Sequence, residues 1–222
     1  MKYHKNNFRL IETILWDKKI KDNNLSKNGF FLLTYHLKRI SKSAKYFKFN
    51  LNKNILIKKL YKLVKKFNST KKYKIRLLLN KKGNINLQHK QLKEKNLKPK
   101  KIVISTKKIN KNNIFVYHKT TNRKIYNQEY NKYKKLCYYD VLFKNQHNQI
   151  TEFSRGNIFI KTGKKIITPP LNCGLLNGVF RKYLILKQKN VIIKPIYEKD
   201  LCKAKKIFFA NSVQGLVEVK LE

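Results

Sequence analysis

Apolar residues near the start of the chain change their spacing from alternating to helical and back, and this pattern constrains the fold more than any other feature. Residues 8–16 alternate well enough to predict a strand. Residues 31–44 and 54–64 repeat their apolar side chains at helical spacing. Residues 74–88 then read as a hairpin that turns at 81–84. Together these elements predict a small α+β domain.

The second half of the chain has a different character. Short apolar runs separated by turns predict strands at residues 140–143, 158–160, 166–168, 206–210 and 215–221. Residues 179–187 have helical propensity, and Pro169-Pro170 precludes a regular helix or a central strand before them. The lysine-rich runs 92–101 and 107–113 show no clear period and are predicted to be loop or linker. We therefore expect two domains, residues 1–113 and 114–222.

The net charge of +43 raises the question of a nucleic-acid partner, because Lys and Arg bind phosphate backbones. The lysines are scattered over the whole length with no separate basic tail. A general enrichment in Lys, Asn and Ile, such as an AT-rich genome imposes, explains them better. The sequence predicts no specific nucleic-acid partner, although electrostatic attraction of acidic metabolites fits this charge.

Length and cysteine content are typical of a globular protein from a reducing compartment. The 222 residues are 41% hydrophobic, which is enough for a sizeable core. Cys137, Cys173 and Cys202 are odd in number and show no C-x-x-C spacing, so neither a disulfide framework nor a zinc site is predicted. No stretch approaches the roughly 20 apolar residues that span a membrane, and the first residues show no signal cleavage site. We expect a cytoplasmic protein without a metal site or a membrane partner.

A series of short motifs follows in one order along nearly the whole chain: Leu10-Ile-Glu-Thr13, His36-Leu-Lys-Arg39, His118-Lys-Thr-Thr-Asn-Arg123, Thr151-Glu-Phe-Ser-Arg-Gly-Asn-Ile-Phe159, Thr168-Pro-Pro-Leu171, Gly174-Leu-Leu-Asn-Gly-Val-Phe-Arg181 and Asn211-Ser-Val-Gln-Gly215. Together they resemble the class IV aminotransferase family, whose enzymes use pyridoxal 5'-phosphate (PLP). The residues of these motifs are most similar to those of the 4-amino-4-deoxychorismate lyases. The resemblance implies the fold-type-IV architecture, with a small N-terminal α/β domain and a larger C-terminal PLP-binding domain built on a barrel-like β-sheet core.

The resemblance also implies catalytic roles for three residues. Lys119 would hold PLP covalently and then act as a general base, which requires its neutral amine. Glu152 would keep the pyridine nitrogen of the cofactor protonated. Thr13 corresponds to a position from which the lyases aid proton transfer.

The phosphate of PLP is expected to meet three parts of the chain. The planar guanidinium of Arg39 suits such an anion. Gly178, Val179 and Phe180 open a predicted helix, whose first backbone N–H groups form an anion site. Ser212 stands where the family commonly places a threonine hydroxyl.

Several neighbouring residues keep open roles. Arg76, Arg123 and Arg181 could each receive a substrate carboxylate or brace the fold, while Glu12, Asn122, Tyr126 and Asn157 have no assigned part. His36 and His118 flank motif residues and are expected to be packed or hydrogen-bonded.

The resemblance predicts a PLP-dependent lyase that releases pyruvate and 4-aminobenzoate from 4-amino-4-deoxychorismate for folate synthesis. A branched-chain or D-amino-acid aminotransferase of the same fold is the first alternative. A basic nucleic-acid-binding protein without enzyme activity is the second. The family further implies a small-molecule amine substrate, a homodimer, and cooperation with aminodeoxychorismate synthase.

Overall fold

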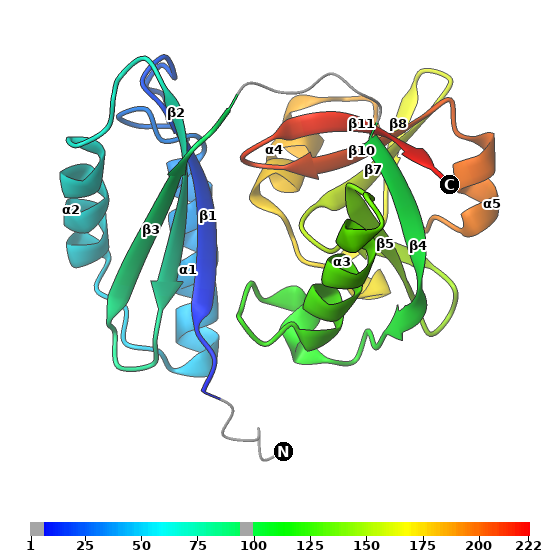
Figure 1. Cartoon of the computed structure of the whole chain (residues 1–222), viewed down its shortest axis with the longest axis horizontal. Helices are drawn as coiled ribbons and strands as arrows, with labels where there is room; N and C mark the ends of the chain where they lie inside the picture. The colour runs from blue at the N-terminus through cyan, green and yellow to red at the C-terminus, as the bar shows by residue number, and fades with distance from the viewer. Residues whose placement is uncertain (1–6, 94–99) are drawn as a thin grey trace. The chain divides into compact units, whose positions relative to one another are not determined.

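The computed structural model describes residues 7–93 and 100–222, which form two compact units (Figure 1). The first unit contains the described residues up to 93 together with residues 118–122. The second contains residues 100–117 and 123–222. Most of the run 92–101, expected to be linker, lies outside the described residues.

A three-stranded antiparallel sheet and two helices make up the first unit. The sheet has the order β1-β2-β3, with bounds β1 Leu10–Asp17, β2 Lys72–Leu79 and β3 Ile85–Gln91. Helices α1 (Leu33–Phe47) and α2 (Lys53–Val64) share one hydrophobic core with it, to which Ile14, Ile40 and Leu60 all belong. The strand, the two helices and the hairpin expected from the apolar spacing are confirmed.

The second unit is built on a closed six-stranded β-barrel (Figure 1). Its strands are β4 Lys100–Ile109, β5 Asp140–Asn145, β6 Ile150–Phe153, β7 Asn157–Thr162, β10 Lys206–Asn211 and β11 Gly215–Leu221. The antiparallel pairing of β7 with β10 closes the barrel. Ile102, Leu142, Ile158 and Phe209 lie in its core. The predicted α+β fold with a barrel-like core is therefore confirmed.

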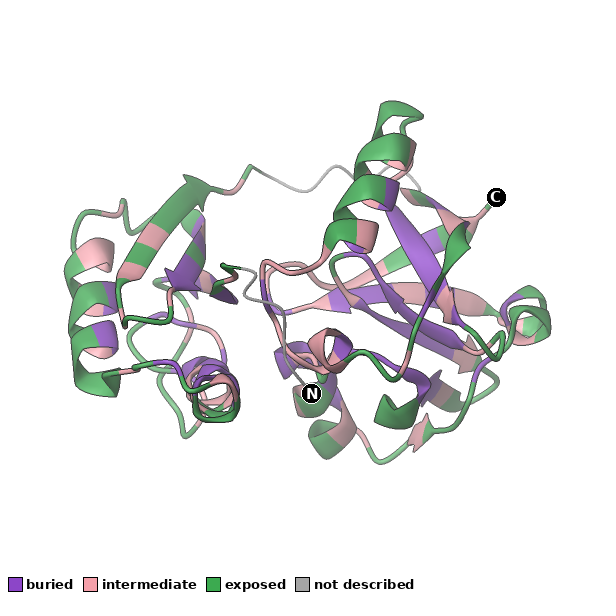
Figure 2. Cartoon of the chain, turned by 90° about the horizontal axis from the view of Figure 1, so that it is seen from below, coloured by how far each residue is buried: buried purple, intermediate pink, exposed green. Residues whose placement is uncertain are grey.

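Helices and two short strands extend the barrel. Strands β8 (Lys165–Thr168) and β9 (Val191–Ile193) continue the sheet beyond β7. Helix α3 (Lys124–Lys135) packs on β4 and β5, where Tyr126, Val141 and Phe143 form a separate apolar cluster. Helix α4 (Val179–Lys187) contacts β10, and the short helix α5 spans Glu198–Lys203. Figure 2 shows the buried barrel strands in purple and the exposed outer faces of helices in green.

The structure corrects part of the sequence analysis. Residues 100–101 and 107–109, expected to be loop, belong to strand β4, whose register shifts between Ile104 and Lys108. Helices α3 and α5 and strands β6 and β9 were not predicted. In α3 the lysines, tyrosines and asparagines dilute the apolar stripe, and only Tyr126 and Glu129 are buried. No helix within the described residues is long and apolar enough to cross a membrane.

Helix α2 offers a matched test of the first unit's core. Leu60 is fully buried, whereas Ile55 on the same helix is 47% exposed. We expect Leu60→Ala to lower the free energy of unfolding by about 2 to 5 kcal/mol, because it leaves a cavity. Ile55→Ala should cost less than about 1 kcal/mol. Urea denaturation followed by circular dichroism measures both, and equal losses would contradict the packing described.

Candidate active site

Lys119 lies in a short loop that is hydrogen-bonded to the start of β1. The backbone N–H of Ile11 donates to the carbonyl oxygen of Lys119 at 2.8 Å, and Thr120 forms a β-bridge with Leu10. The 3-10 helix Ile114–Tyr117 precedes the loop. Lys119 is half-buried, so it is not an exposed lysine of a basic loop.

Thr13 lies on the face of the sheet that α1 and α2 leave uncovered. Side chains alternate along a strand, and Glu12 on the other face bonds to α1. The antiparallel register pairs Thr13 with Arg76, and Arg76 with Gln88 of β3. Directly paired residues point to the same face, so these three side chains form a polar row across the sheet. Arg76 and Gln88 are exposed.

Arg39, the expected phosphate ligand, is paired with a buried carboxylate. Its Nε donates to Glu12 Oε1 at 2.8 Å and its Nη2 to Glu12 Oε2 at 2.6 Å. His36 Nδ1 lies 2.6 Å from the same Oε2. This bidentate pairing uses one edge of the guanidinium and leaves the Nη1 edge for a second acceptor.

The charges around Glu12 set its ionisation. Burial acts to raise the pKa of Glu12, but the charge and hydrogen bonds of Arg39, followed by those of His36, lower that pKa from 4.5 to about 2. Burial lowers the pKa of His36, Glu12 opposes that shift, and the charges of Arg39 and Lys119 add to it. His36 Nε2 is buried and has no hydrogen-bond partner in the described part of the chain. A neutral imidazole that donates from Nδ1 to Glu12 fits these contacts.

Glu152 is a buried carboxylate of the second unit. It lies on β6 directly opposite Asn157 of β7. Tyr126 Oη donates to Glu152 Oε1 at 3.3 Å, and Asn157 Nδ2 donates to Oε2 at 3.5 Å. Burial, then the nearby Glu152, raises the pKa of Tyr126, so its phenol stays protonated as a donor. The structure thus gives Tyr126 and Asn157 the roles that the sequence left open: they orient Glu152.

The start of α4 is arranged around Asn157. Gly178 is its N-cap residue, and no side chain within the described residues caps the helix there. Asn157 Nδ2 also donates to the carbonyl oxygen of Leu176 at 2.9 Å. A Cβ on Gly178 would lie 1.9 Å from Asn157 Oδ1, so only glycine fits this position. The first backbone N–H groups of α4, at Val179 and Phe180, therefore follow a tightly packed turn and carry the positive end of the helix dipole.

Ser212 lies in the turn between β10 and β11 and is buried. Asn211 shapes this turn, because its Oδ1 accepts hydrogen bonds from Val213 N at 3.0 Å and Gln214 N at 2.9 Å. Gly215 ends the turn with a φ of 71°, a conformation that favours glycine.

Two of the three candidate arginines brace the fold. Arg181 is buried and donates to Pro169 O at 2.7 Å, and burial lowers its pKa to about 10. Arg123 donates to the carbonyl oxygen of Ser154 and lies over the Tyr126 ring. Arg76, on the open sheet face beside Thr13, has no such bracing contact among the described residues.

His36 and His118 are both packed, as the sequence led us to expect. His118 Nδ1 lies 2.9 Å from Ser43 Oγ, and its ring contacts Tyr46 and Phe47 at centroid distances of 4.7 Å. Over the described ranges, no three His, Cys, Asp or Glu side chains are grouped to hold a metal ion.

Comparison with known proteins identifies the family. The model of the family described as "Amino-transferase class IV" matches residues 9–221. The chain belongs to the class IV aminotransferase family. A Schizosaccharomyces pombe protein named "Putative aminodeoxychorismate lyase" is 30% identical over 185 residues, which cover 79% of this chain and 72% of that protein.

Two further similarities point to aminotransferases. A Thermotoga maritima protein named "Probable branched-chain-amino-acid aminotransferase" is 32% identical over 87 residues, which cover 37% of this chain and 32% of that relative's length. A crystal structure described as "a Putative amino-acid aminotransferase" from Mesorhizobium loti superposes with a TM-score of 0.87 at 26% identity, and covers 97% of this chain and 100% of that one. The relatives of this chain therefore include proteins named as lyases and as aminotransferases.

The side chains present suit PLP, the cofactor of this family. The first unit offers the half-buried amine of Lys119 for an aldehyde, and a guanidinium edge at Arg39 for an anion. The second unit offers the Glu152 carboxylate for a pyridine nitrogen. It also offers two donor groups for a phosphate, at the start of α4 and at Ser212. Each of these groups, considered within its own unit, is of a kind that suits one part of PLP.

The buried Glu12 carboxylate predicts a specific loss of stability in acid. Because its pKa is about 2 in the folded protein and 4.5 ordinarily, its ionised form stabilises the fold above pH 4.5. That stabilisation, about 3 kcal/mol, is lost as the pH falls from about 4.5 to about 2. Glu12→Gln should therefore be less stable than wild type at pH 7, and the two stabilities should converge in acid.

Urea denaturation between pH 7 and pH 3 measures this convergence. Glu218→Gln is the control, because its ion pair with Lys206 lies on the surface and should contribute less than about 1 kcal/mol. A constant difference between wild type and Glu12→Gln at every pH would contradict the assignment.

Proposed function

We propose that this protein is a PLP-dependent 4-amino-4-deoxychorismate lyase that releases pyruvate and 4-aminobenzoate. The main support is the 30% identity with the Schizosaccharomyces pombe protein, which extends over 79% of this chain. Arg76 and Gln88, which are exposed and in register with Thr13, add support, because they offer polar groups to a substrate on the same face of the sheet.

Two residues would hold the aldehyde carbon and the ring nitrogen of the cofactor. Lys119 Nζ would hold the cofactor covalently through its aldehyde, and Glu152 would keep a proton on the ring nitrogen. When bound, PLP supplies a ring that accepts the electrons of a breaking bond. Tyr126 and Asn157 orient the Glu152 carboxylate. Arg39, the start of α4 and Ser212 would bind the phosphate.

The proposed reaction then proceeds by proton transfer and cleavage of the substrate. The released Lys119 Nζ removes the proton from the amine-bearing carbon of the substrate. The carbon–oxygen bond to the pyruvyl group breaks, and the ring becomes aromatic. The Thr13 hydroxyl aids delivery of a proton to the methylene carbon of the departing enolate, which gives pyruvate. Aromatisation makes this cleavage strongly favourable.

An aminotransferase is the second candidate. The Thermotoga maritima and Mesorhizobium loti proteins support it. In that reaction Lys119 would again move the proton of the amine-bearing carbon, and a keto acid would leave. The lyase proposal carries further proposals with it: a role in folate synthesis, a supply of substrate by aminodeoxychorismate synthase, and a homodimer in the cytoplasm.

One assay separates the two reactions. Purified protein with PLP should show the yellow absorbance of a lysine-bound cofactor, and it should release pyruvate and 4-aminobenzoate without any added keto acid. Lys119→Ala should lose the absorbance band and at least about 100-fold in rate, because it removes the covalent anchor and the base. Lys124→Ala, at an exposed lysine close to Lys119 in the sequence, should leave both unchanged. Amino-acid turnover that depends on 2-oxoglutarate would instead support the aminotransferase.

We also infer that Arg76 binds a substrate carboxylate. Arg123 and Arg181 are engaged in bracing contacts, whereas Arg76 lies exposed in register with Thr13. A guanidinium receives a carboxylate through two parallel hydrogen bonds.

Arg76→Ala should raise KM about 10- to 100-fold with a smaller change in kcat, because a charge-assisted contact to the ground state is lost. Lys90→Ala, on the same exposed face of the sheet, is the matched control. Steady-state kinetics measure both variants. A fall in kcat at constant KM would contradict this role.

A further inference from the structure

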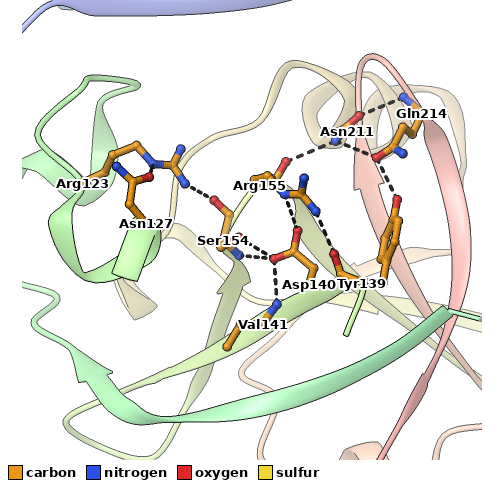
Figure 3. Close-up of polar contacts among 9 residues, drawn as sticks. All are labelled: Arg123, Asn127, Tyr139, Asp140, Val141, Ser154, Arg155, Asn211 and Gln214. Carbon is orange, nitrogen blue, oxygen red and sulfur yellow. Dashed lines mark hydrogen bonds and ion pairs between the residues drawn. The ribbon is translucent and has the colours of Figure 1, made fainter. Parts of the chain in front are cut away.

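A ring of hydrogen bonds joins three separate segments of the second unit (Figure 3). The segments are the start of β5, the turn between β6 and β7, and the turn between β10 and β11. The ring passes from Asp140 to Arg155, from Arg155 to Asn211, from Asn211 to Gln214, and back to Tyr139 beside Asp140. Apart from Asn211, which shapes the turn around Ser212, these residues have no role assigned above.

Asp140 is the buried member of the ring. Its Oδ1 accepts hydrogen bonds from Ser154 N at 3.0 Å, Ser154 Oγ at 2.5 Å and Val141 N at 2.8 Å. Its Oδ2 accepts from Arg155 Nε at 3.0 Å. Burial raises the pKa of Asp140, while the charge of Arg155 and the donated hydrogen bonds act in the opposite direction. The carboxylate therefore fixes the turn that directly follows Glu152 and Phe153.

Arg155 connects Asp140 to Asn211. Its Nη2 donates to the carbonyl oxygen of Tyr139 at 2.7 Å, and its guanidinium lies 3.8 Å from the ring centroid of Tyr130 on α3. With its side chain held on both sides, the backbone carbonyl of Arg155 has a defined position. That carbonyl accepts a hydrogen bond from Asn211 Nδ2 at 3.2 Å.

Asn211 is the point where the ring reaches the turn that contains Ser212. Its Nδ2 bonds to Arg155, and its Oδ1 accepts the backbone N–H groups of Val213 and Gln214. Gln214 Oε1 accepts from Tyr139 Oη at 2.8 Å, which closes the ring. Figure 3 shows Arg155 lying between Asp140 and Asn211. The residue between Asn211 and Val213 is Ser212, the proposed phosphate donor.

We propose that Asp140 is a positioning residue for phosphate binding, which acts through Arg155 and Asn211 on the turn that carries Ser212. Donors that are held in place before the ligand arrives bind an anion more tightly than mobile donors, because no ordering is needed on binding. The inference rests on the binding of PLP, as the proposed function does, but not on which reaction follows.

The test compares PLP with pyridoxal, which has the same aldehyde and ring but no phosphate. In Asp140→Asn the dissociation constant for PLP should rise about tenfold. This is the effect expected when one charge-assisted hydrogen bond, here the bond from Ser212 to the phosphate, is lost. The dissociation constant for pyridoxal should change less than about twofold. Absorbance titration of the lysine-bound form measures both ligands.

Asn211→Ala provides a second variant that leaves the Asp140–Arg155 pair intact, in case Asp140→Asn does not fold. It should show the same selective loss of PLP affinity. The double variant should lose no more PLP affinity than the weaker-binding single variant, because both substitutions disrupt the same series of contacts. Glu198→Gln, which removes a surface ion pair with Lys144 in the same unit, should leave both affinities unchanged.

Equal weakening of PLP and pyridoxal, or no weakening of either, would overturn the positioning role while PLP use stands. Wild-type protein that binds neither ligand would overturn both this inference and the proposed function.

Discussion

The pairing of β7 with β10 is the interaction on which the second unit depends. It joins strands from distant parts of the chain, with Ile158 opposite Phe209 and Asn157 opposite Ala210. The pairing removes two sheet edges and encloses a core of branched and aromatic side chains. It also brings the hairpin that carries Glu152 beside the turn that carries Ser212. The two proposed contacts to opposite ends of one cofactor are therefore set by barrel closure.

Buried acids organise a protein whose charge is overwhelmingly positive. Of the 11 acidic residues, the following are buried: Glu12, Asp17, Glu129, Asp140 and Glu152. Each accepts at least one hydrogen bond, because an isolated buried carboxylate would be costly. With these acids inside, the lysines dominate the surface. Such a surface attracts anions, which suits a chain that we propose binds a phosphate cofactor and a substrate with carboxylates.

The sequence predicted those elements whose signal is local. β1 and α1 show their apolar period within their own residues, α4 shows helical propensity there, and the structure confirms all three. β4 and α3 escaped prediction because lysines occupy their exposed positions, and because a register shift in β4 interrupts its alternation. Their burial depends on neighbouring strands of the barrel, which no local window contains.

The site residues also divide into those with a local sequence signal and those recognised only from their contacts. The motifs singled out Lys119 and Glu152, whereas the partners that orient Glu152 became visible only in three dimensions. Asp140 could not be singled out from the sequence, because a single acid before an apolar run is typical of the start of a strand. Only its contacts with Ser154 and Arg155 reveal its part.

By itself, the sequence determined the family, the cofactor class, and which amine and which carboxylate are candidates for the chemistry, because these depend on the kinds of residue present and on their order. Only the tertiary structure decided that Arg39 pairs with Glu12, that Arg123 and Arg181 brace the fold while Arg76 is exposed, and that Asp140 connects to Asn211. These contacts join residues that are distant along the chain. They exist because strand register and barrel closure bring particular side chains within hydrogen-bonding distance, and neither is encoded in any single segment.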